Sequence, residues 1–128
     1  MAEPLVFIST CRLKEGKLED YRRLSRKITD LVETGEPDMV HFGFFVDDET
    51  NEVTTLQVHR SAENMARHMQ LVAAPHLKES AEILDYSTMR IALYGAPTEA
   101  VLTQVRQLAG TGASVSINSP VAAFGRFG

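Results

Sequence analysis

The stretch "EPDMVHFGFF", residues 36–45, decides the fold because it leaves neither side of a strand suited to water. Successive residues of a strand point to opposite faces of a sheet. The two faces are Val40, Phe42 and Phe44 on one side, and His41, Gly43 and Phe45 on the other. A chain of only 128 residues must therefore find cover for both sides of this strand.

Residues 5–13, "LVFISTCRL", have the same property. β-Branched and aromatic residues are frequent there, and both faces of the predicted strand are mostly apolar. The next segment, 17–33, is instead predicted to be an amphipathic helix, because its apolar residues recur on one stripe. That stripe consists of Leu18, Tyr21, Leu24, Ile28, Leu31 and Val32. The helix thus has one apolar side, whereas the strands have two.

The rest of the chain continues the alternation of strands and helices. A polar turn, "DDETN" at 47–51, predicts a hairpin between two strands. Ser61 is the expected N-cap of the following helix, and Pro75 is expected to break it. The predicted elements are strands over 39–46 and 52–59, a helix over 62–73, a short helical piece up to 84 and a strand over 86–94.

The order β-α-β-β-α-β predicts an α+β fold of the ferredoxin-like type, an antiparallel sheet with helices on one face. The other face would remain apolar and exposed. The simplest cover is a second copy of the chain, sheet against sheet, in a two-fold dimer. We therefore expect a homodimer through the open sheet face, with His41 at the dimer seam.

A C-terminal extension, residues 96–128, is expected to follow a ferredoxin-like domain of residues 1–95. The extension is predicted to contain a helix over 97–109 and a short strand over 114–118. The final tail has apolar residues that can anchor it, either along its own sheet or across the dimer. These residues are Val121, Phe124 and Phe127.

Composition excludes several classes of protein. The formal net charge of −4 argues against a nucleic-acid-binding surface. Cys11 is the only cysteine, so no internal disulfide can form, and its apolar strand predicts a buried small hydrophobe. The start "MAEPLVFIST" lacks the features of a signal peptide, and no segment is long enough to span a bilayer. We expect a cytoplasmic protein with no membrane partner.

Two segments resemble a known family. "EPDMVHF" is similar to the Glu-Pro-Gly-x-Leu-x-Tyr run that opens the second strand of antibiotic biosynthesis monooxygenase-like domains. "LQVHRSAENMARHM" is similar to that family's Glu-x-Trp-x-Ser segment and the following helix, which carries a His. The resemblance covers about residues 5–94. It implies a dimeric α/β barrel with a pocket between sheet and helices.

Members of this family differ in activity. Some oxidise aromatic polyketides or quinols with molecular oxygen and no metal or flavin, others bind or degrade haem, and many have no assigned activity. This chain departs from the family pattern at Asp38, Gln57 and His59, which stand in place of Gly, Glu and Trp. Its Pro75 and His76 follow the helical His about three residues later than the family's Pro-His pair.

His68 is the candidate catalytic residue. It shares one face of the predicted helix with Met65, Met69 and Val72, and this face is expected to look toward the sheet. A neutral imidazole there can act as general base toward a substrate hydroxyl, the step that oxygenation without a cofactor requires. The alternative is a buried His that is hydrogen-bonded to the backbone.

Five further residues are candidates for substrate binding. His76 can line the pocket mouth or be a solvated helix residue, and His59 can contact a ligand at a strand end. Tyr21 and Tyr94 can orient an aromatic substrate through their hydroxyls, although core packing is the commoner use. Arg90 can bind a carboxylate or enolate, or form an inter-subunit salt bridge, which we favour.

No cofactor is expected. The spacing of the four histidines gives no compact metal-ligand motif. The chain has no Trp, which related haem-degrading domains use, and no Gly-rich phosphate loop follows a strand.

The favoured hypothesis is a cofactor-independent monooxygenase acting on a small phenolic, quinol or polyketide-type aromatic. One alternative is a non-catalytic module that binds a small ligand, and another is an interaction domain that uses the tail from Gly95 onward. The first two predict a cavity of a few hundred Å³ between helices and sheet, whereas the third predicts a filled interior.

Overall fold

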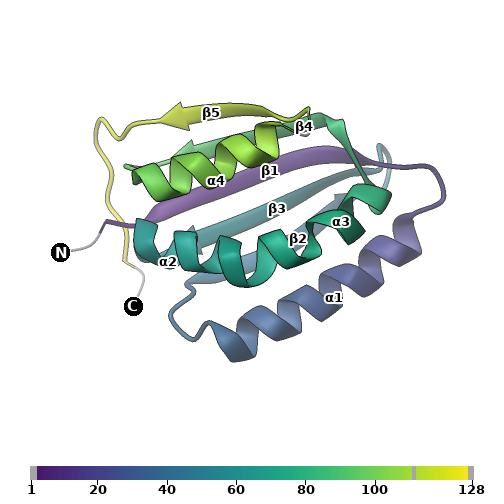
Figure 1. The fold of residues 1–128 in the computed structure, drawn as a ribbon, viewed down its shortest axis with the longest axis horizontal. Coiled ribbons are helices and arrows are strands. Elements are labelled where there is room, and N and C mark those ends of the chain that lie inside the picture. Colours follow the sequence, from purple (N-terminus) through teal and green to yellow (C-terminus); the bar gives the residue numbers. More distant parts are fainter. Residues whose placement is uncertain (1–2, 111, 127–128) are drawn as a thin grey trace.

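The computed structural model describes residues 3–110 and 112–126 (Figure 1). A single sheet with strand order β2-β3-β1-β4-β5 carries all the helices. The strands are β1 (Leu5–Leu13), β2 (His41–Asp47), β3 (Glu52–His59), β4 (Leu84–Tyr94) and β5 (Ser114–Asn118). The helices are α1 (Leu18–Gly35), α2 (Ala62–His68), the π-helical turn η1 (Met69–Ala73), α3 (Ala74–Ile83) and α4 (Glu99–Ala109).

The sheet has the predicted ferredoxin-like arrangement. Its central strand β1 pairs antiparallel with β3 on one side and with β4 on the other. The hairpin partner β2 forms one edge, antiparallel to β3. The extension adds β5 parallel to β4 at the opposite edge. The α+β prediction is confirmed, and the sheet within one chain is open.

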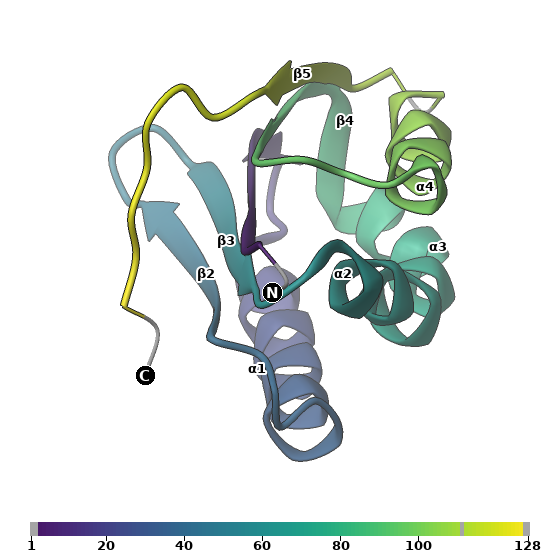
Figure 2. The same cartoon turned by 90° about the vertical axis from the view of Figure 1, so that its left-hand side faces the viewer.

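All helices lie on one side of the sheet, and the C-terminal tail passes on the other side (Figure 2). The alternation predicted for the strands holds: Leu5, Phe7 and Cys11 of β1 are buried under the helices. On α1 the buried side chains belong to the predicted stripe, but Leu31 is 47% exposed because it lies at the margin of that stripe. The core sits between the helices and this sheet face.

The opposite sheet face remains uncovered. Phe45 of β2 and Tyr94 of β4 point to this side and are 50% and 46% exposed. Between them lie Ile8, Leu56 and Val58, which are only half-buried because neighbouring strands crowd them. The face is therefore apolar and open along the middle of the sheet.

The prediction that Pro75 breaks the second helix is wrong. The helix continues from Ala62 to Ile83 and passes through η1, which ends two residues before the proline. Proline has no N–H and its ring collides with the carbonyl four residues earlier in an α-helix. The wider π turn, in which the N–H of Ala74 bonds the carbonyl of Met69, accommodates that ring.

The tail does not pack along its own sheet. Val121 is fully exposed and Phe124 is 77% exposed, with the Arg126 guanidinium 4.5 Å from the centre of the Phe124 ring. The third predicted anchor, Phe127, lies outside the described residues.

No described helix is long and apolar enough to cross a membrane. The division at residue 95 stays a prediction.

Candidate functional site

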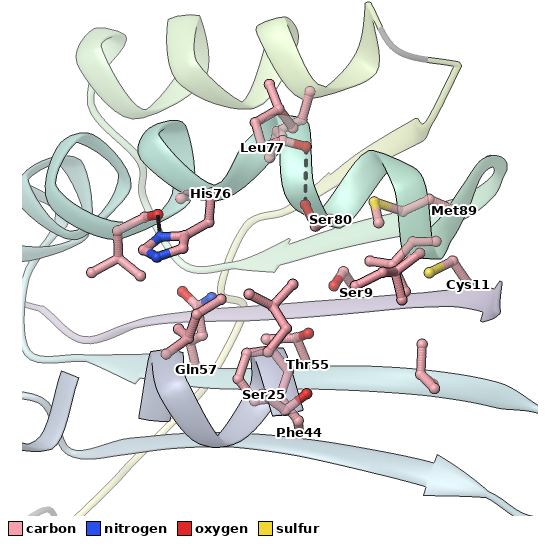
Figure 3. Close-up of a pocket in the computed structure, with 18 of the residues that line it drawn as sticks. Ser9, Cys11, Ser25, Phe44, Thr55, Gln57, His76, Leu77, Ser80 and Met89 are labelled. Carbon is pink, nitrogen blue, oxygen red and sulfur yellow. Dashed lines mark hydrogen bonds between the residues drawn. The ribbon is translucent and has the colours of Figure 1, made fainter. Parts of the chain in front are cut away.

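A cavity of about 120 Å³ lies between the sheet and the helical segments α1, η1 and α3. Its polar and apolar lining residues come from both layers, and Ser9, Gln57, His76 and Ser80 point into it (Figure 3). The cavity is smaller than the few hundred Å³ expected. An apolar cavity of about 150 Å³ binds benzene, so the present one suits a single small ring.

His68 lines this cavity and is paired with a carboxylate. Ser61 caps α2, as predicted, by accepting a hydrogen bond from the backbone N–H of Asn64. His68 is the last residue of that helix and is 1% exposed. Its Nδ1 lies 2.7 Å from Oε2 of Glu36, whose side chain is 10% exposed. Because a carboxylate only accepts, Nδ1–H is the donor, and in the neutral ring Nε2 carries a free lone pair.

His59 ends β3 and is not among the side chains that line the cavity, so its predicted ligand contact stays a prediction. It is 1% exposed, and its Nε2 lies 2.8 Å from Oε1 of Gln57, which does line the cavity. Burial, and then the neighbouring His68, lower the pKa of His59 to about 3. The ring is neutral at pH 7 and donates to the Gln57 carbonyl. His59 therefore positions Gln57, and its ring lies 5.3 Å from that of His68.

His76 lies in the cavity wall, where α3 begins. Its Nδ1 is 2.7 Å from the carbonyl oxygen of Val72, one helical turn earlier (Figure 3). A backbone carbonyl only accepts, so Nδ1–H donates and Nε2 is left as an acceptor. The placement agrees with the predicted position at the pocket, and the hydrogen bond fixes the tautomer.

Tyr21 also lines the cavity, and its contact with a substrate stays a prediction. It is 6% exposed, and among the described residues its hydroxyl makes no regular hydrogen bond, although the side chain of Ser25, one helical turn away, interacts with it and opposes the rise in its pKa. Burial raises the pKa of Tyr21 to about 12. Across the cavity the Tyr86 hydroxyl lies 2.8 Å from Oγ of Ser80, and burial raises the pKa of Tyr86 as well. Both phenols are neutral at pH 7 and can donate hydrogen bonds.

Tyr94 and Arg90 are not brought to this cavity. Both lie on the uncovered face of β4, because the even-numbered residues in the last part of that strand point away from the helices. Nη2 of Arg90 lies 3.5 Å from Oε2 of Glu52 in the same chain. Arg90 thus has an intrachain partner, and the inter-subunit bridge stays a prediction.

Cys11 lies at the far end of the cavity and is 3% exposed, as its apolar strand predicted. Burial, with Asp85 and Glu52 adding to it, raises the pKa of this thiol to about 12.

In residues 3–110 and 112–126 no three His, Cys, Asp or Glu side chains are grouped so that they could hold a metal ion.

The residue that sequence reasoning missed is Glu36. It is 32 positions from His68, and the two lie in different elements. The available signal was its place in "EPDMVHF", directly after α1 and before Pro37. Ser80 and Tyr86 were also missed, since a helix Ser and a strand Tyr carry no distinguishing pattern.

At the level of sequence, no protein-family model and no curated protein matches this chain. Solved structures do match its fold. MupZ from Pseudomonas fluorescens superimposes with a TM-score of 0.71 at 15% identity, over 97% of this chain and 95% of that one.

Two further matches cover a smaller share of this chain. A "putative antibiotic biosynthesis monooxygenase" from Bacteroides thetaiotaomicron has a TM-score of 0.60 at 16% identity, over 70% of this chain and 85% of that one. A protein of the same name from Caulobacter crescentus has a TM-score of 0.61 at 12% identity, over 72% and 88%. The chain therefore has the fold of antibiotic biosynthesis monooxygenase-like domains.

Proposed function

We propose that the protein is a cofactor-independent monooxygenase acting on a small phenol or quinol with one aromatic ring. The observation that carries this proposal is the His68–Glu36 pair at the wall of the interior cavity. A buried imidazole whose Nδ1–H is held by a carboxylate has its Nε2 ready to accept a proton. The carboxylate then stabilises the imidazolium that forms.

The chemistry begins with proton transfer from the substrate hydroxyl to Nε2 of His68. The resulting phenolate is electron-rich and can pass an electron to molecular oxygen, after which the two radicals combine at a ring carbon. For a hydroquinone, loss of water from the peroxide yields the hydroxyquinone. One molecule of hydroquinone and one of oxygen thus give one hydroxyquinone and one water. Oxygen is reduced and the ring is oxidised, with no further reductant.

The surrounding residues fit this step. Tyr21 offers a neutral hydroxyl to the substrate, and Nε2 of His76 can accept a hydrogen bond from a second substrate hydroxyl. The low pKa of His59 keeps that ring uncharged beside His68, so it does not repel an imidazolium there. The rings of Phe42 and Phe44 form an apolar wall, which favours an aromatic substrate.

Oxygen uptake with a panel of single-ring hydroquinones tests the proposal. His68→Gln is expected to lower kcat by about 10²–10⁴-fold, the usual contribution of a general base. Glu36→Gln is expected to lower it as well, because a neutral amide no longer stabilises the imidazolium. Glu33→Gln, which replaces an exposed carboxylate on α1, is the matched control and should leave uptake unchanged.

Uptake that survives His68→Gln would contradict the assignment of the base. Quinol binding without turnover in the native protein would instead favour the non-catalytic ligand-binding module. The same proteins serve both tests. Oxygen uptake measures turnover, and calorimetry measures quinol binding even where no oxygen is consumed.

A homodimer through the uncovered sheet face is part of the proposal. Support comes from the apolar side chains there, which a second sheet would cover. Sedimentation velocity at micromolar concentration should give a dimer, and Leu56→Lys, at the centre of the face, should give a monomer. Leu71→Lys is the control, because Leu71 is 58% exposed on the helical side. A monomeric native protein would contradict this arrangement. A cytoplasmic location stays a prediction.

A further inference from the structure

We propose that the groove between α3 and α4 binds an uncharged alkyl or acyl chain attached to the ring that occupies the interior cavity. The inference rests on the proposed function for the ring and adds a second part to the substrate. The groove measures about 410 Å³. It is lined by η1, α3 and one face of α4.

The groove and the interior cavity are neighbours. Ala73, Leu77 and Leu108 line both of them, so these three side chains form a common wall. Ala73 is small, and Leu77 is only half-buried on its helix. In this proposal, a chain attached to a ring in the cavity reaches the groove by displacing the side chain of Leu77 from the common wall.

The π-helical turn η1 contributes to both hollows. Val72 faces the interior cavity, Gln70 faces the groove, and Ala73 belongs to the common wall. An extra residue in one turn rotates the following helix, so that side chains of the same helix are presented to two sites. The turn that accommodates Pro75 also places these two sites next to each other.

The chemistry of the lining selects an uncharged chain. Small and apolar residues set the width of the groove, and the polar groups are amides and one hydroxyl, with no charged side chain. By contrast, the hollow between α1 and the end of α3 is lined mostly by charges, including Lys17, Asp20 and Glu79. An uncharged lining binds methylene groups without desolvating an ion.

Gln104 adds a specific acceptor. Its Nε2 lies 3.0 Å from the carbonyl oxygen of Ala66 and donates to it, which fixes the orientation of the amide. Its Oε1 is buried and has no hydrogen-bond partner among the described residues. A hydroxyl or amide N–H on the chain would satisfy this oxygen.

A series of alkylhydroquinones tests the inference. In the native protein, 2-hexylhydroquinone should bind at least about tenfold more tightly than 2-methylhydroquinone, because each fully buried methylene contributes about fourfold. Calorimetry gives the dissociation constants, and the amide NMR signals of α4 should shift with the hexyl compound only. Oxygen uptake with the same compounds gives KM.

Two variants fill the groove from its exposed rim, Thr103→Trp and Ala100→Trp. Each variant should bind the hexyl compound no more tightly than the methyl compound. The affinity for the methyl compound should be unchanged. Arg106→Trp, on a side of α4 that does not line the groove, should keep the gain. Using two positions guards against a variant that fails to fold.

Equal affinities for the methyl and hexyl compounds in the native protein would overturn the inference. A gain that persists in both groove variants would do the same, since the chain would then lie elsewhere. If turnover does not depend on chain length, the proposed monooxygenase function holds, but the groove does not bind the chain. If binding depends on chain length but no oxygen is consumed, the groove binds the chain and the proposed monooxygenase function is wrong.

Discussion

The buried His59 makes the stability of this protein depend on pH, and replacing it by Gln should remove that dependence. The pKa of His59 is about 3 in the folded chain, against an ordinary value of 6.5 when the chain unfolds. Between these two values the unfolded state binds a proton that the folded state does not. The free energy of unfolding therefore rises with pH across this window. The stability that the neutral His59 contributes is lost as the pH falls through it.

The magnitude follows from the size of the shift. Each pH unit below 6.5 costs about 1.4 kcal/mol, so lowering the pH to 5 removes about 2 kcal/mol of stability. The full window amounts to about 5 kcal/mol. In a urea titration, 2 kcal/mol corresponds to a midpoint lower by about 1 M. The chain has no Trp, so circular dichroism is the suitable signal.

The comparison uses native protein and His59→Gln at pH 7.5, 6 and 5. An amide can keep the hydrogen bond to Gln57 but takes up no proton, so the difference between the two proteins should shrink as the pH falls. Other titrating groups are shared and largely cancel. Parallel pH dependences for native protein and His59→Gln would refute this reasoning.

Two further predictions concern buried groups of the cavity. Tyr21→Phe should raise the free energy of unfolding by up to about 1 kcal/mol, because the buried hydroxyl that it removes makes no regular hydrogen bond among the described residues and only a weak interaction with the Ser25 side chain. The same change should weaken hydroquinone binding by about fivefold, measured by calorimetry, and a stabilised variant with unchanged affinity would show that the hydroxyl does not contact the ligand. Cys11, with a pKa of about 12, should react with Ellman's reagent in urea but hardly at all in the folded protein at pH 8. Rapid reaction without urea would mean that the strand opens easily.

The strand faces could be predicted because a period of two residues is a local property. Phe42 and Phe44 reach the cavity and His41 faces the uncovered side, as the alternation in 36–45 requires. The same reasoning placed Tyr21 on the buried side of α1, since a helical stripe is also local.

The pairing of His68 with Glu36 could not be predicted in this way. No periodicity relates a residue at the end of α2 to one just beyond α1, and their contact depends on how the two helices cross the sheet. Pro75 was misjudged for a different reason. A rule about isolated helices ignores packing, and here the helix keeps its course by widening one turn.

The stretch that opens β2 links the cavity to the uncovered face. Phe42 and Phe44 contact the site, while on the other side the rings of His41 and Phe45 lie nearly parallel, 11° apart, with their centres separated by 6.2 Å. Gly43 makes this arrangement possible, since a Cβ there would lie 3.1 Å from both rings. A shift of one residue in the pairing with β3 would exchange the two faces of β2. Both the aromatic cavity wall and the stacked ring pair would then be lost. Substrate pocket and proposed dimer surface therefore depend on one register, so a substitution that alters this register should impair oxygen uptake and association together.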